Sequence, residues 1–283
     1  MALMTLAEAK DNAVSIFWLS SLLFLSRAAY DSSYMRVWAA TYGDGVVNVI
    51  LGSAAFVAFW LFSAIMMVID ATQPAWAQHY KIQPDKHVTG EQTWKGFKIA
   101  VRNQFLVSLP MSYVWFNYVL PARGVSPSDP IPPLSTVVRD LLVFLVVEEI
   151  MFYYSHRLLH TKPFYAKFHK LHHEFTAPIG VVSIYCTILE MVVANILPLM
   201  TGPTIMGSHI TTIAPWFTFA VINTINTHCG YDFPGLNSPL QHDWHHEIFN
   251  ECFGVLGVLD TLHKTNTRFL GKLNLAASKA KKA

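Results

Sequence analysis

Residues 46–69 carry no charged side chain and are apolar almost throughout. A helix needs about 20 mostly apolar residues to cross the hydrocarbon core of a bilayer, and this segment is long enough. Apolar residues make up 53% of the 283-residue chain and charged residues only 13%, whereas soluble domains average about 25% charged residues. Both observations predict an integral membrane protein.

Five further apolar runs are candidates for membrane or interfacial helices. They are residues 13–26, 101–120, 134–154, 181–200 and 205–225. Pro110 predicts a kink in the second run, because proline removes a helical hydrogen bond, and Thr201-Gly202-Pro203 separates the last two. The expected fold class is an all-α integral membrane protein, a bundle of about four or more transmembrane helices with a cytosolic histidine-rich cap.

Three parts of the chain follow from this distribution. Residues 1–133 hold N-terminal membrane helices and a polar linker at 71–96, and they end in a Pro/Gly-rich loop. Residues 134–267 carry all the histidine motifs, and residues 268–283 form a basic cytosolic tail.

The distribution of lysines predicts the orientation. Lys162, Lys167 and Lys170 lie beside the histidine motifs, and the tail carries Lys279 and Lys281. Because positive flanks favour the cytoplasmic side, we expect a multi-pass protein with its histidines and C-terminus in the cytosol. The tail K-A-K-K-A also matches the K-x-K-x-x retrieval pattern and so predicts the endoplasmic reticulum membrane; a solvated basic tail near anionic lipid is the alternative.

Other features exclude other classes of protein. The formal net charge is +2, and there is no basic stripe with interleaved aromatic residues, so nucleic acid is not an expected partner. The three cysteines lie far apart without a CxxC pair, which predicts buried thiols in a reducing environment. No cleavable signal peptide is expected, because Glu8, Lys10 and Asp11 precede the first apolar run.

Three histidine motifs, H-R-L-L-H, H-K-L-H-H and H-D-W-H-H, follow one another along the chain. Residues three and four apart share one face of a helix, so each motif can direct its imidazoles to one point. Neutral imidazole is a good ligand for iron, zinc and copper, whereas clustered imidazoles without a metal are destabilised by desolvation and mutual repulsion. The predicted metal ligands are His156, His160, His169, His172, His173, His242, His245 and His246.

Eight imidazoles exceed the needs of one ion. A structural zinc closes with four ligands, whereas two octahedral ions offer about twelve positions and would leave some open for water, oxygen or a bridging group. We therefore expect a reactive pair of ions. His228, which precedes a turn, is the candidate ninth ligand, and Asn223, Asn226 and Asp232 remain candidates to complete the set.

In this order, the three motifs resemble those of the membrane fatty acid hydroxylase/sterol desaturase superfamily. The resemblance covers residues 137–267, and "HKLHHEFTAPIG", "HCGYDFP" and "LDTLHKTN" resemble its C-4 methylsterol oxidase branch. That branch usually shows "LHGT" near its end, but Lys264 stands here in place of glycine. We therefore expect His263 to support the fold or a ligand, and not to bind metal itself.

The resemblance implies two iron ions, bound by the histidines of the three motifs, that activate molecular oxygen at an unactivated C–H bond. Zinc can replace such iron during purification. The resemblance also implies electrons from NAD(P)H, delivered through cytochrome b5 or a similar carrier and its reductase. Because no haem-binding "HPGG" stretch is present in the sequence, the donor is expected to be a separate protein.

Carboxylates near the motifs are candidates to hold an imidazole N–H. Glu149 precedes His156 by seven residues, on roughly the same helical face, and Asp243 and Glu247 flank ligands in the last motif. A carboxylate at membrane depth is costly and usually has a partner. For Glu148 the alternative is a residue at the edge of the bilayer.

The predicted function is a membrane diiron monooxygenase that oxidises a lipid, with the C-4 methyl group of a sterol precursor as the preferred target. Hydroxylation or desaturation of a fatty acid or sphingolipid is an alternative, because the motifs report the metal and not the pocket. A catalytically silent metal-binding membrane scaffold is a third hypothesis.

Overall fold

A computed structural model describes residues 6–31 and 34–280. In these ranges the chain is helical, and its one β-type contact is an isolated antiparallel bridge between Lys81 and Tyr231. The all-α prediction is confirmed for the described residues.

In the described residues, π and 3₁₀ segments join fifteen α-helical segments. The α-helices are α1 (Leu6–Asp31), α2 (Tyr34–Tyr42), α3 (Asp44–Thr72), α4 (Ala75–Gln78), α5 (Gly90–Asn103), α6 (Leu109–Val114), α7 (Leu120–Ala122), α8 (Leu134–Leu159), α9 (Lys162–Phe164), α10 (Ile188–Glu190), α11 (Leu197–Met206), α12 (Ile210–Thr227), α13 (Leu240–Ile248), α14 (Val258–His263) and α15 (Thr267–Ala280). The π segments are η1 (Gln104–Ser108), η2 (Trp115–Val119), η3 (Tyr165–His169) and η6 (Met191–Ile196), and the 3₁₀ segments are η4 (His172–Glu174) and η5 (Gly180–Ile184).

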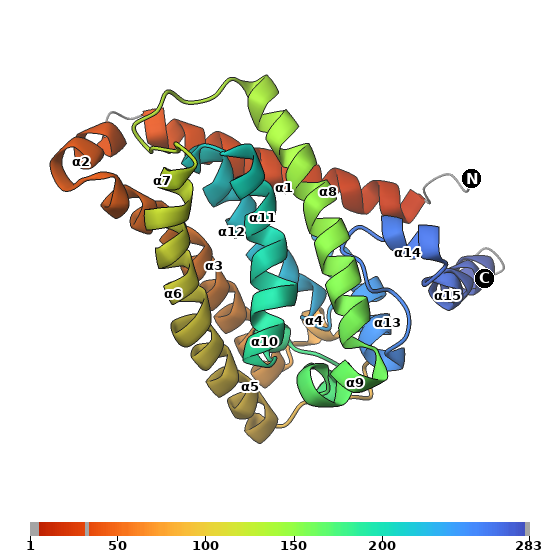
Figure 1. Cartoon of the computed structure of the whole chain (residues 1–283). Coiled ribbons are helices and arrows are strands. Elements are labelled where there is room, and N and C mark those ends of the chain that lie inside the picture. The colour runs from red at the N-terminus through yellow and green to blue at the C-terminus, as the bar shows by residue number, and fades with distance from the viewer. Residues whose placement is uncertain (1–5, 32–33, 281–283) are drawn as a thin grey trace.

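The long helices alternate in direction (Figure 1). Helices α3, α8 and α12 run towards one end of the bundle, while α5–α7 and α10–α11 run back from it. Hydrogen bonds tie both ends: Tyr231, just beyond α12, donates to Asp70 near the end of α3, and Arg123 after α7 donates to the carbonyl of Thr204 in α11. The C-terminal ends of α8 and α12 and the first residues of α10 therefore lie at the same end of the molecule.

Two helical stretches in the described residues are long and apolar enough to cross a membrane, Asp44–Thr72 and Ile188–Met206. The first contains the predicted run 46–69, and only 17% of its most apolar window is buried. Helix α8 carries Arg139, Asp140 and two glutamates, which lowers its hydropathy, and the apolar part of α1 is shorter. A bundle of four or more spans is therefore not established by helix length and composition.

Prolines account for three of the four π segments in the described residues, η1, η2 and η6. In each of these segments, a proline is the second residue after the last π residue: Pro110, Pro121 and Pro198. A proline ring clashes with the carbonyl four residues earlier in an α-helix, and a π turn widens the backbone at that place. At Pro110, where the sequence predicted a kink, the helical path from α5 to α7 continues through two such widened turns.

The boundary predicted at Thr201-Gly202-Pro203 is wrong. Helix α11 continues to Met206 and ends at Gly207, whose φ of 58° is left-handed. Pro203 cannot bond the carbonyl of Leu199, and Trp216 donates its indole N–H to that oxygen instead, at 3.4 Å. The predicted run 181–200 also begins later, at Ile188, because residues 180–184 form the buried η5 turn.

Candidate metal centre

The nine predicted histidines come from four places in the fold. His156 lies in the last turn of α8 with His160 at its C-cap, and His228 is the C-cap of α12. The H-D-W-H-H motif lies on α13, as expected for a helix. The H-K-L-H-H motif does not form an α-helix: His169 ends the π segment η3, and the next two histidines begin the 3₁₀ turn η4.

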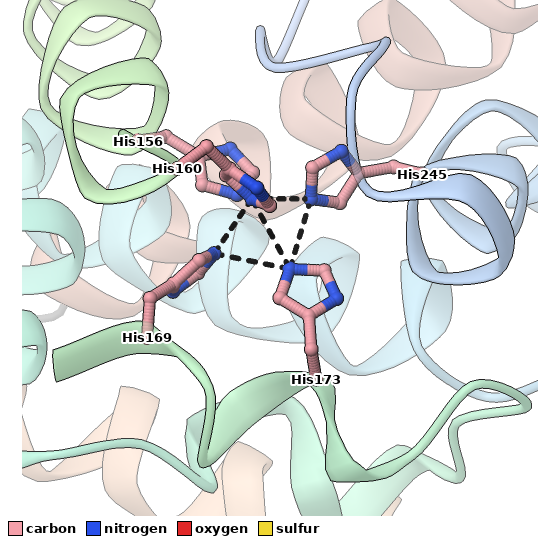
Figure 2. Close-up of side chains that lie close together, drawn as sticks. All are labelled: His156, His160, His169, His173 and His245. Carbon is pink, nitrogen blue, oxygen red and sulfur yellow. Dashed lines mark hydrogen bonds between the residues drawn. The ribbon is translucent and has the colours of Figure 1, made fainter. Parts of the chain in front are cut away.

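These side chains converge into two groups, and the ligand atoms within each lie no more than 4.8 Å apart. We call them site A and site B. Site A contains His156, His160, His169, His173 and His245, and its rings point towards one another in Figure 2. Site B contains His172, His228, His242 and His246. All nine histidines singled out from the sequence are therefore brought together.

Within site A, the Nε2 atoms face each other at short range. The Nε2 atom of His160 lies 2.8 Å from that of His169, 3.1 Å from that of His245 and 3.2 Å from that of His173. Nitrogen ligands about 2.1 Å from a metal, at right angles to one another, lie about 3 Å apart. The distances in site A are those of neighbouring ligands on a single ion.

Site B has the same character. The Nε2 atom of His242 lies 2.8 Å from that of His228 and 3.1 Å from that of His246. The two sites adjoin, because the ring centroids of His173 in site A and His246 in site B are 4.8 Å apart. The arrangement offers two neighbouring places for an ion.

Acceptor oxygens hold the other ring nitrogen of six of these histidines. Nδ1 of His156 contacts the Phe253 carbonyl at 2.9 Å, and Nδ1 of His245 contacts the Glu251 carbonyl at 2.7 Å. The remaining four contacts are His169 to the Glu190 carboxylate, His172 to the Tyr185 carbonyl, His228 to the Thr224 carbonyl and His246 to the Phe175 carbonyl. Because a carbonyl oxygen only accepts, the proton of a neutral ring lies on Nδ1, and Nε2 is left with a lone pair directed into the site.

Burial keeps these imidazoles neutral. It lowers the pKa of His156 and His228 to about 4 and that of His160 to about 2. Desolvation is the largest cause in each case, because a charged ring loses its hydration. The pKa values of the other six histidines are also lowered, with neighbouring imidazoles adding to the effect of burial. A neutral imidazole is the form that binds a metal.

A cavity of about 1170 Å³ opens onto both sites. His156 and His169 of site A line it, as do His172, His228 and His242 of site B. Most of its remaining wall is apolar, with aromatic side chains such as Phe59 and Trp216. Large apolar cavities with a few convergent polar groups are typical of sites for small apolar ligands.

The two carboxylates predicted to accept an imidazole N–H, Glu149 and Asp243, accept hydrogen bonds from other groups. Glu149 is buried, but its oxygens accept the backbone N–H groups of Val255, Leu256 and Leu259, at 2.8–3.0 Å. Asp243 accepts both of its side-chain hydrogen bonds from Gln83. Both predictions are corrected by these contacts, because helix periodicity placed Glu149 near His156 without accounting for the returning loop before α14.

The carboxylate that does hold an imidazole is Glu190, which was not singled out from the sequence. Its Oε1 lies 2.7 Å from Nδ1 of His169, and both side chains are buried. Glu190 lies inside an apolar run, "TILEMVVA", and a lone acid in such a run is the signal that could have found it.

The remaining candidates lie outside both sites. Asn223 accepts from Asn237, and Asn226 donates to the carbonyl of the same residue. Neither they nor Asp232 belongs to site A or site B. His263 stacks on Tyr153 and pairs with the hydroxyl of Tyr154 at 3.0 Å, as expected for a residue that supports the fold.

The fold and the site together define a class of protein: a helical chain with two adjoining all-histidine sites, suited to metal ions, beside a large apolar cavity. The family model described as fatty acid hydroxylase matches residues 141–265, which contain all nine histidines. Residues 141–265 therefore form a domain of the fatty acid hydroxylase family.

Curated relatives agree with this assignment. The chain is 44% identical over 214 residues to fatty acid hydroxylase domain-containing protein 2 of Macaca fascicularis, covering 75% of this chain and 64% of the relative. It is 32% identical over 199 residues to C-4 methylsterol oxidase erg25 of Schizosaccharomyces pombe, covering 66% and 65%. Identity to methylsterol monooxygenase 1 of Danio rerio is 29% over 248 residues, covering 84% and 81%. No solved structure matches the chain.

Proposed function

We propose that the protein is a membrane oxygenase that oxidises a C–H bond of a lipid with two iron ions, one in site A and one in site B. The observation that carries the proposal is the convergence of nine neutral imidazoles into two adjoining groups, with acceptor oxygens that leave an Nε2 lone pair directed inwards on six of them. Five and four nitrogens leave positions open on two octahedral ions. Such ions, when bound, supply the activation of molecular oxygen.

The residues of this chain prepare that chemistry. Backbone carbonyls and Glu190 fix the orientation of six imidazole rings. These rings therefore need little reorganisation when metal ions bind. The apolar wall of the cavity excludes water from the histidines, and this protects a reactive centre from side reactions. The shape of the cavity then selects which carbon of the lipid lies beside His156 and His172.

For the substrate we propose the C-4 methyl group of a sterol precursor. Relatives named C-4 methylsterol oxidase and methylsterol monooxygenase support this proposal. A fatty acid or sphingolipid is the second candidate, because the chain is also 31% identical over 252 residues to fatty acid hydroxylase ahd1 of Mycosarcoma maydis. The whole activity remains a proposal, since the chain spans 64% of the length of fatty acid hydroxylase domain-containing protein 2.

We further propose a multi-pass protein of the endoplasmic reticulum membrane with the sites on the cytosolic side. The two apolar helices α3 and α10–α11 and the lysines beside the histidines support this location. Electrons would come from NAD(P)H through a separate carrier such as cytochrome b5. Lys281 of the proposed retrieval signal lies outside the described residues.

Metal analysis together with turnover tests the function. We expect wild-type protein purified without oxygen to hold about two irons per chain and to oxidise a 4-methylsterol when oxygen and an electron donor are added. His245→Ala removes an Nε2 from site A; it should lose about one iron and all turnover yet remain in the membrane fraction. His87→Ala, an exposed histidine outside both sites, is the matched control. A redox-inert zinc protein without oxygen consumption would contradict the proposal and favour a silent scaffold.

A further inference from the structure

The cavity is long as well as large. Along α12 its wall extends from His228 back to Trp216, which corresponds to about 18 Å at 1.5 Å per residue. Phe116 and Leu199 line the cavity as well. A lipid with its oxidised carbon at the histidines would therefore place the rest of its length against this wall.

One face of α8 forms part of the wall. Leu145, Glu148, Phe152 and His156 all line the cavity, at the three- and four-residue spacings that share a helical face. Glu148 precedes His156 by two helical turns, a separation of about 12 Å along the axis. A carboxyl group thus lies in the cavity wall at a fixed depth from site A.

Glu148 is half-buried, and its contacts differ from those of the buried Glu149 and Glu190. Glu149 accepts three backbone N–H groups, and Glu190 accepts the imidazole N–H of His169. Glu148 makes no hydrogen bond within the part of the chain that the structure describes, and no lysine, arginine or aspartate is found among the cavity-lining residues there. Among the described residues, its carboxyl group therefore has neither a cation nor a hydrogen-bond donor as a partner.

An unpaired carboxyl group in an apolar cavity is costly. Membrane proteins retain such groups where they bind a partner or a substrate. The ligand that fits must reach the cavity through apolar contacts and carry a hydrogen-bond donor at one position. Among lipids, an alcohol satisfies both conditions.

We propose that Glu148 binds the hydroxyl group of the lipid substrate and so fixes the depth at which the lipid lies beside the histidines. The inference rests on the proposed lipid oxidation and deepens it, because it assigns the substrate to the lipid alcohols and names the side chain that recognises them.

Matched pairs of ligands test the proposal. Full-length, iron-loaded protein in detergent micelles is titrated with 4,4-dimethylcholestanol and its 3-O-methyl ether, and with hexadecanol and its methyl ether. We expect wild-type protein to bind the alcohol of at least one pair about tenfold more tightly than the ether, the effect of one hydrogen bond to a charged or strongly polar group. Glu148→Leu should bind the alcohol and the ether of that pair equally.

Glu148→Gln keeps an acceptor oxygen in the same place and should retain part of the preference. Glu91→Leu, an exposed glutamate in α5, makes the same chemical change away from the cavity and should keep all of it. Iron content and oxygen consumption are measured for every variant, so loss of the proposed function is seen separately from loss of alcohol binding. A wild-type protein that binds neither alcohol more tightly than its ether overturns the inference, as does an undiminished preference in Glu148→Leu or, if that variant does not fold, in Glu148→Gln.

Discussion

His169 is the one histidine whose Nδ1 is held by a carboxylate and not by a backbone carbonyl. Glu190→Gln keeps an acceptor oxygen there but replaces the carboxyl group by an amide, whereas Glu190→Leu removes the acceptor. Loss of such a partner typically weakens metal binding 10- to 100-fold. We expect about that loss of iron affinity in Glu190→Leu and a smaller loss in Glu190→Gln, measured by competition with a chelator.

Glu247→Gln is the control for this comparison. Glu247 pairs with Lys272 at the surface, at 3.4 Å, and lies next to His246 without belonging to either site. Its replacement should leave iron affinity within about twofold of wild type, because exposed ion pairs contribute little. Equal iron affinities for Glu190→Leu and wild type would mean that Glu190 does not position His169.

Low pH should destabilise the metal-free protein. An unfolded histidine binds a proton near pH 6.5, but burial lowers the pKa of His156 to about 4 in the folded protein. The unfolded state therefore binds more protons between these values, and each such histidine costs roughly 1.4 kcal/mol of stability per pH unit. We expect the melting temperature of metal-free protein to fall steadily as the pH decreases from 6.5 to 4. A melting temperature constant over this range would show that the buried rings already carry protons.

The sequence predicted the histidines of the two sites better than it predicted their supports. Spacings of three and four residues identify imidazoles that can converge, and His228 was identified because it precedes a turn shortly before the H-D-W-H-H motif. The atoms that hold the rings are mostly backbone carbonyls, such as those of Phe253 and Glu251. Every residue has a carbonyl, so no residue type marks these positions in a sequence.

At the level of elements, the contact between α8 and α11 depends on Gly202. A Cβ atom added there would lie 2.9 Å from the Cα atom of Phe144 in α8. Gly202→Ala should therefore force the two helices apart and lower stability by about 1–3 kcal/mol. Because α8 ends in His156 and His160, we also expect weaker iron binding, measured with thermal unfolding on the same samples.

Gly271→Ala provides the matched glycine control. A Cβ atom at Gly271 in α15 meets no atom within 4 Å, and alanine is a better helix former than glycine by roughly 0.5–1 kcal/mol. This variant should be unchanged or slightly more stable than wild type. A Gly202→Ala protein as stable as Gly271→Ala would show that the close approach of the helices is not required.

The sequence predicted helix boundaries correctly where residue composition determines them. It failed where contacts with another helix determine them. The predicted run 46–69 lies within α3 because apolar composition alone favours a helix there. The end predicted at Pro203 failed because Trp216, from the next helix, takes the carbonyl that the proline leaves free. The pattern of residues along one segment does not predict a hydrogen-bond donor that comes from another helix.

For the whole molecule, the proposed orientation can be tested with two sugar-acceptor sites at opposite ends. Gly124→Asn creates Asn-Val-Ser in the loop between α7 and α8, and His87→Asn creates Asn-Val-Thr between α4 and α5. Figure 1 places these connections at opposite ends of the bundle. Gly124 has a φ of 74° and nothing within 4 Å of an added Cβ atom, and asparagine tolerates this conformation.

If the histidines face the cytosol, microsomes should add a glycan to Gly124→Asn and none to His87→Asn, because acceptor sites are modified only on the lumenal side. A mobility shift removed by endoglycosidase measures the result. The reverse pattern would contradict the proposed topology.

The composition of sites A and B has a consequence for the synthesis of the protein. Site A draws on His156 and His245, and site B on His172 and His246, so each combines early and late parts of the same stretch. A ribosome must therefore have translated as far as α13 before either group can be complete. A metal ion can therefore find a complete set of ligands in either site only after α13 has been made, when α1 to α12 already exist.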